Sequence, residues 1–153
     1  MIERAKVDGL SAGQKRDARA FAEAFFSRDG GPVPVERLDA FVAELADFFG
    51  HVRGRARWLF LACLATATWG APLLVGRPFT RLSAMAVPAR LEALEALERF
   101  PVAQLALFAV KAVTSLVYYE HPDAMEELRW DQRCHGKKAL PVLSSSSAAE
   151  ADA

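Results

Sequence analysis

The sequence is poor in residues that build covalent or metal cross-links. It holds only two cysteines in 153 residues, Cys63 in an apolar run and Cys134 in a polar stretch. Neither has a CxxC partner, so the spacing indicates neither a zinc ribbon nor a redox pair and favours a reducing compartment. A chain of this length can bury enough apolar surface to fold as one domain without such cross-links.

Excess charge is also absent, because 19 Lys and Arg residues balance 19 Asp and Glu residues. A neutral chain has no overall field to attract nucleic acid or an anionic membrane surface. The first ten residues carry mixed charges, no apolar run and no Arg-Arg pair, so we expect neither a Sec nor a twin-arginine signal and a cytoplasmic location.

The common nucleotide-binding and zinc-protease signatures are missing as well: the sequence has no GxGxxG, GxxxxGK[ST] or HExxH. The nearest approach to a metal site is the set His121, Asp131, Cys134 and His135, whose spacing matches no zinc pattern. Glu92, Glu95 and Glu98 alternate with leucines, which is typical of a solvated helix face rather than of paired catalytic carboxylates. We therefore expect no catalytic residue, metal or cofactor in this chain.

What the sequence does contain is helical periodicity. Ser11 and Gln14 form a capping-box pattern and open a predicted helix over about 12–27, which the glycines and prolines of 29–34 end. An apolar stripe from Val35 to Phe49 predicts a second helix, ended by Gly50. No segment alternates with period two for long enough to be a strand.

The segment from Trp58 to Gly76 has no charged residue, and Arg53, Arg55 and Arg57 precede it. It can be interpreted as a buried core helix or as a membrane span at about 58–75. We favour the core helix, because Gly70 and Pro72 predict that the helix stops near residue 70, too short to cross a bilayer. We interpret the arginines as a soluble helix start rather than as a lipid or phosphate site.

Two further helices are predicted in the second half of the chain. One begins at about Pro88, and Pro101 separates it from a helix over 102–119 whose only charge is Lys111. Apolar residues nearly all round this last helix predict the central buried element of a bundle. A short helix over 124–128 is also predicted. The chain thus divides into a flexible N-terminus (1–10), an all-α bundle of about five to six helices (11–133) and a disordered tail (134–153).

From Ala71 to Cys134 the sequence resembles a known helical module. The matching fragments occur in the family's order: 71–74, 76–82, 91–99, 110–113, 118–122 and 130–134. The module is the small helical (gamma) subunit of gluconate 2-dehydrogenase-type enzymes, and equally the helical region before the flavin domain of some bacterial glucose-methanol-choline (GMC) oxidoreductases. The resemblance covers somewhat under half of the chain.

The resemblance implies a non-catalytic accessory subunit that supports the assembly or stability of an FAD-dependent dehydrogenase or oxidase. In that family the large GMC-type subunit holds FAD and oxidises an alcohol, sugar or sterol hydroxyl. Because Trp, Tyr and Arg are enriched at interface anchors, we expect the partner contacts at a small set of residues. These are Arg77, Phe79, Arg81, Tyr118, Tyr119 and Trp130. The alternative for Phe79, Tyr118 and Tyr119 is that they only close the bundle.

Overall fold

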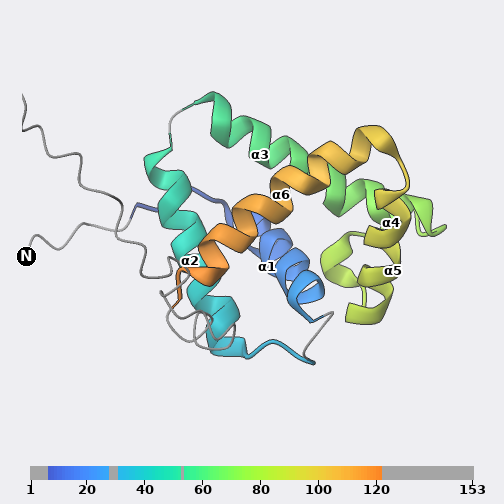
Figure 1. Ribbon diagram of the computed structural model, residues 1–153, viewed down its shortest axis with the longest axis horizontal. Coiled ribbons are helices and arrows are strands. Elements are labelled where there is room, and N and C mark those ends of the chain that lie inside the picture. The colour runs from blue at the N-terminus through green and yellow to red at the C-terminus, as the bar shows by residue number, and fades with distance from the viewer. Residues whose placement is uncertain (1–6, 28–30, 53, 122–153) are drawn as a thin grey trace, which may run out of the picture.

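A computed structural model describes residues 7–27, 31–52 and 54–121 (Figure 1). Within these ranges the chain is helical and contains no strand, which confirms the predicted all-α class. The elements are α1 (Ala12–Phe26), α2 (Val35–His51), α3 (Arg55–Ala65), the π turn η1 (Thr66–Gly70), α4 (Ala71–Leu74), the 3₁₀ turn η2 (Leu82–Ala84), α5 (Val87–Glu98) and α6 (Pro101–Tyr119). The predictions for Trp130, for the helix over 124–128 and for the tail over 134–153 lie outside the described residues.

Helix α1 is the centre of the bundle and packs against α2, α5 and η2. Its start confirms the capping box, because the Ser11 side chain accepts from the Gln14 backbone N–H and the Gln14 side chain accepts from the Ser11 N–H. Its buried side is Phe21 among small alanines, which allow neighbouring helices to approach closely. Figure 1 shows α6 crossing in front of α1, with α2 on one side and α4 and α5 on the other.

Helix α2 does not end at Gly50, as predicted, but continues to His51. Gly50 instead lies where the segment before α1 crosses α2. The Gly9 N–H donates to the Ala46 carbonyl at 2.9 Å, and a Cβ built on Gly50 would stand 2.2 Å from the Val7 carbonyl oxygen. The close approach of two backbones, rather than a helix C-cap, therefore requires this glycine.

The helix that begins at Arg55 does not stop near Gly70, and that prediction is wrong. The π turn η1 leads directly into α4, so the helical run extends to Leu74. Pro72 lies in the first turn of α4, where a missing N–H costs little. We refer to the continuous run Arg55–Leu74 as α3–α4; it packs against α6 through α3 and against α5 through α4.

A buried arginine joins α5 to the centre of the bundle. The Arg90 side chain is only 11% exposed, and its Nη1 pairs with Glu23 of α1 at 2.6 Å. Its Nε donates to the Met85 carbonyl at 2.7 Å, and its remaining N–H groups reach the carbonyls of Ser83 and Ala20, both at 3.4 Å. Arg90 thereby holds α1, the end of η2 and α5 together.

Candidate functional site

The outer side of α3–α4 is lined with large apolar side chains. Trp58, Leu59, Trp69 and Leu73 recur at helical spacing and are all exposed, Trp58 to 76%. The opposite side of the same run carries Phe60, Leu64, Ala67 and Ala71, which are buried.

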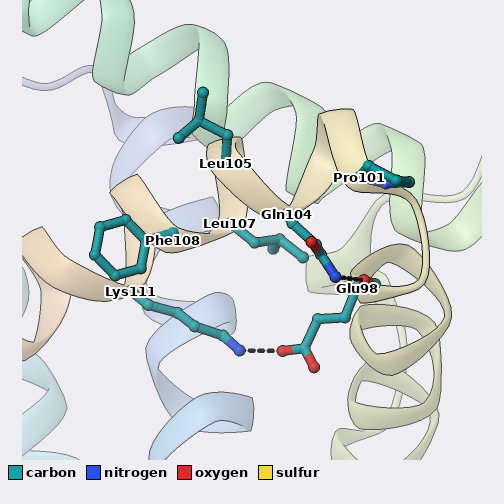
Figure 2. A pocket seen from close by; sticks show the side chains of 7 residues that line it. All are labelled: Glu98, Pro101, Gln104, Leu105, Leu107, Phe108 and Lys111. Carbon is teal, nitrogen blue, oxygen red and sulfur yellow. Dashed lines mark hydrogen bonds and ion pairs between the residues drawn. The ribbon is translucent and has the colours of Figure 1, made fainter.

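Helix α6 has the same division. Ala103, Leu107, Val110, Thr114, Val117 and Tyr118 form its buried side. Val102, Leu105, Phe108 and Leu116 lie on the other side and are exposed, Val102 to 90%. Figure 2 shows Leu105 on the opposite side of α6 from the pair formed by Lys111 and Glu98.

Because α3 and α6 pack against each other, these two stripes lie on adjacent helices. We define the apolar face as Trp58, Leu59, Trp69 and Leu73 of α3–α4 with Val102, Leu105, Phe108 and Leu116 of α6. A monomeric protein rarely exposes so many large apolar side chains on neighbouring elements without a binding purpose.

The sequence predicts that α3–α4 and α6 are buried core helices, and the exposure of the apolar face shows that this prediction is wrong. Only 33% of the most apolar stretch of each helix is buried. The physical reason is that too few other elements surround them: each helix packs one side onto the bundle, and nothing in the described residues covers the other. By length and composition both helices are also long and apolar enough to cross a membrane, a test that core helices of soluble proteins pass too.

The flank of α6 next to α5 is polar. Lys111 pairs with Glu98, and Gln104 donates to the Glu98 carbonyl at 2.8 Å (Figure 2). Together with Leu105 and Phe108 these side chains line an open hollow of about 520 Å³. Lys111 also lies 5.3 Å from the centre of the Phe25 ring. The lone cation of α6 is therefore used within the fold and does not interrupt the apolar face.

The predicted contact residues Arg77, Phe79 and Arg81 follow α4. Phe79 is 98% exposed and has a positive φ of 67°, so its ring contributes almost nothing to the fold and its backbone is strained. The Arg81 guanidinium lies 4.6 Å from the centre of the Trp69 ring and 3.9 Å from the Asp17 carboxylate. Arg81 thus holds the Trp69 ring beside the start of α1.

The predicted contact residues Tyr118 and Tyr119 lie at the other end of α6, beside α2 (Figure 1). Tyr118 is buried, stacks on Phe26 at 3.8 Å and accepts a hydrogen bond from Arg37 Nη1 at 3.2 Å. Tyr119 is half-buried and meets the Phe26 ring edge-on. The structure therefore does not bring the two groups of predicted contact residues together, and Tyr118 packs as a bundle-closing residue does.

Within the described ranges no three His, Cys, Asp or Glu side chains come close enough to hold a metal. Glu92 and Glu95 are exposed on α5, whereas Glu98 pairs with Lys111. Cys63 is a free, half-buried thiol.

Sequence reasoning missed the apolar face, although the sequence carries a signal for it. In α3–α4 the large residues Trp58, Trp69 and Leu73 fall on one side of the helix, whereas Ala67 and Ala71 fall on the other. Small residues mark the side where another helix approaches closely, so the large side chains mark the uncovered side.

Comparison of the chain with protein-family models, with curated proteins and with solved structures gives no match.

Proposed function

We propose that this chain is a non-catalytic accessory subunit that docks, through the apolar face, on the FAD-binding large subunit of a GMC-type oxidoreductase. The observation that carries the proposal is the exposure of large apolar side chains on two adjacent helices. The identity of the partner rests on the ordered resemblance of residues 71–134 to the small helical subunit of such enzymes. The partner supplies the flavin and the catalysis.

The composition of the apolar face supports a protein partner. Interface centres are enriched in aromatic residues and depleted in Asp, Glu and Lys. The apolar face contains Trp58, Trp69 and Phe108, and neither α3–α4 nor α6 contains an Asp or Glu. Well-packed Trp side chains are frequent hot spots of binding energy, so we expect Trp58 and Trp69 to contribute most.

The bundle itself argues against the alternative of a membrane span. If α3–α4 or α6 crossed a bilayer in this fold, α2 and α5 would have to enter with it, because they pack against α6. Both carry exposed carboxylates, such as Glu36, Glu92 and Glu95, and each charge at the bilayer centre costs about 3 kcal/mol. Docking on another protein has no such cost.

The test is to look for a GMC-type flavoprotein encoded beside this chain's gene and to co-express it with the chain, followed by co-purification and measurement of Kd. Phe108→Gln and Trp69→Gln each place a polar group in the apolar face. We expect each to weaken binding by at least 2 kcal/mol, about thirtyfold in Kd. Because Phe108 is 69% and Trp69 is 48% exposed in the isolated chain, the free energy of unfolding should change less than the binding free energy.

Val35→Gln is the matched control, since Val35 is an exposed apolar residue at the start of α2, outside the apolar face. It should bind like the unmodified chain. Equal recovery of the flavoprotein with all three variants would refute docking through the apolar face, and the lack of a neighbouring GMC-type gene would refute the assignment of the partner.

A further inference from the structure

The pairing of cations is uneven across the molecule. Most of the described lysines and arginines are held within the fold: Lys15 by Asp8, Arg19 by Asp39, Arg81 by Asp17, Arg90 by Glu23 and Lys111 by Glu98. Arg37 donates to Tyr118. Within the part of the chain that the structure describes, the side chains without an ion pair or hydrogen bond are those of Arg16, Arg55, Arg57, Arg77 and Arg99.

All of these except Arg16 lie at the ends of the helices that form the apolar face. Arg55 and Arg57 are in the first turn of α3, Arg77 follows α4, and Arg99 directly precedes α6. Arg77 and Arg99 are at the same end of the bundle, where α4 and α5 pack together. The helical run between Arg55 and Leu74 is about 30 Å long at 1.5 Å per residue. The apolar face therefore has unpaired positive charge at both ends.

No carboxylate in the neighbouring sequence offsets the charges of Arg55, Arg57 and Arg77, and Glu98, which precedes Arg99, pairs with Lys111. From Phe48 to Leu91 the chain has no Asp or Glu, whereas α2 and α5 carry most of the acids of the described helices. The net charge of zero thus hides a separation of charge over the surface. Charge at an interface rim steers association and selects partners of the opposite sign.

We propose that the partner surface is apolar at its centre and acidic at two places about 30 Å apart, which the unpaired arginines at each end of the apolar face contact. This inference rests on the proposed function and adds the chemistry that selects the partner. Arg55 and Arg57 form one end, and Arg77 and Arg99 form the other. Arg81 supports the second end indirectly, because it holds Trp69 in place.

The arrangement fits an acidic protein surface better than an anionic lipid surface. Helices that lie on membranes have a charged face toward water, opposite to the apolar one. In α3–α4 and α6 the side opposite the apolar face is instead buried in the bundle. Basic segments that bind anionic lipid also gather four to eight cations in one cluster, and here the cations are divided between two ends.

The test uses single charge reversals of exposed arginines. Arg55→Glu, Arg77→Glu and Arg99→Glu each remove one unpaired cation at the rim, and Arg16→Glu, on α1, is the matched control. Binding of each purified variant to the proposed GMC-type partner is measured by surface plasmon resonance at several NaCl concentrations. A Glu at position 55 also suits the positive end of α3, so folding should not suffer.

We expect each rim variant to associate about tenfold more slowly at low salt and to depend less on NaCl than the unmodified chain, with Arg16→Glu unchanged. If the rim variants bind normally while Phe108→Gln does not, the acidic partner surface is refuted and docking through the apolar face stands. If neither set of variants alters binding, both proposals fall. Binding to vesicles of phosphatidylcholine with phosphatidylglycerol, without binding to the flavoprotein, would also overturn both.

Discussion

Replacement of Arg90 by Met should destabilise the bundle more than any single change at the apolar face. The substitution keeps an unbranched chain of similar length but removes the charge and every N–H donor. It breaks the 2.6 Å pair with Glu23 and the 2.7 Å bond to the Met85 carbonyl, and it removes the longer contacts to Ala20 and Ser83. The prediction therefore concerns the link between α1 and α5.

The stability lost by Arg90→Met follows from how deeply Arg90 and Glu23 are buried. Loss of one partner from a fully buried ion pair costs 3–5 kcal/mol. Glu23 is 36% exposed, so water can solvate its carboxylate after Arg90 is gone, and the electrostatic part is smaller. The Met85 carbonyl then loses a charge-assisted hydrogen bond, which adds about 1–2 kcal/mol. We expect the free energy of unfolding to fall by about 3 kcal/mol in total.

The assay is urea unfolding followed by far-ultraviolet circular dichroism. Glu23→Gln is the comparison, because it removes the charge of the half-buried partner but leaves the carbonyl contacts of Arg90 intact, so it should cost about 1–2 kcal/mol, less than Arg90→Met. The reasoning is refuted if Arg90→Met unfolds at the same urea concentration as the unmodified chain, or if both variants lose equal stability.

Three further predictions concern local features of the fold. Gly50→Ala should lower the free energy of unfolding by more than about 2 kcal/mol in the same assay, because the alanine Cβ would meet the Val7 carbonyl. A loss below about 1 kcal/mol would contradict the close crossing of α2 by the segment before α1. Thr68 Oγ1 is buried without a hydrogen-bond partner in the described structure, so Thr68→Val should raise stability by about 1 kcal/mol, whereas a lower stability would show that the hydroxyl is satisfied. The Lys15 ammonium, 2.6 Å from the Asp8 carboxylate, lowers the pKa of Asp8 below 3.8. The pairing of Asp8 with Lys15 therefore stabilises the fold fully above the pKa of Asp8 in the unfolded chain, and this stabilisation is lost as the pH falls through the lower pKa of the folded chain. An NMR titration of Asp8 with a midpoint at or above 3.8 would contradict the pairing.

Local signals in the sequence were sufficient to predict most helix ends. Ser11 with Gln14 marks the start of α1, and Pro101 marks the start of α6, because caps and prolines act through their immediate neighbours. The stop predicted near Gly70 was wrong because a π turn carries the helix across that sequence, and its geometry depends on packing against α5 and α6.

Burial was harder to predict than helix position. Periodicity shows which sides of a helix are apolar but not how many neighbours are available to cover them. The pattern therefore predicts a central α6, although Phe108 and Leu116 are exposed. The burial of Arg90 depends on Glu23, 67 residues away, and no local pattern reports such a pair. Of the predicted contact residues, Phe79 could be expected at the surface because it lies in a loop beside a proline, whereas the burial of Tyr118 follows from Phe26 and Arg37.

Hydroxyl-radical footprinting of the chain, free and in complex with the proposed GMC-type partner, tests the docking proposal most directly. Trp58, Trp69 and Phe108 are exposed in the isolated bundle and react readily, so their oxidation can be measured residue by residue. We expect strong protection of all three in the complex and unchanged oxidation of the buried Phe21, which serves as the reference. Equal oxidation of the three exposed residues in the free chain and in the complex would show that the partner does not cover the apolar face.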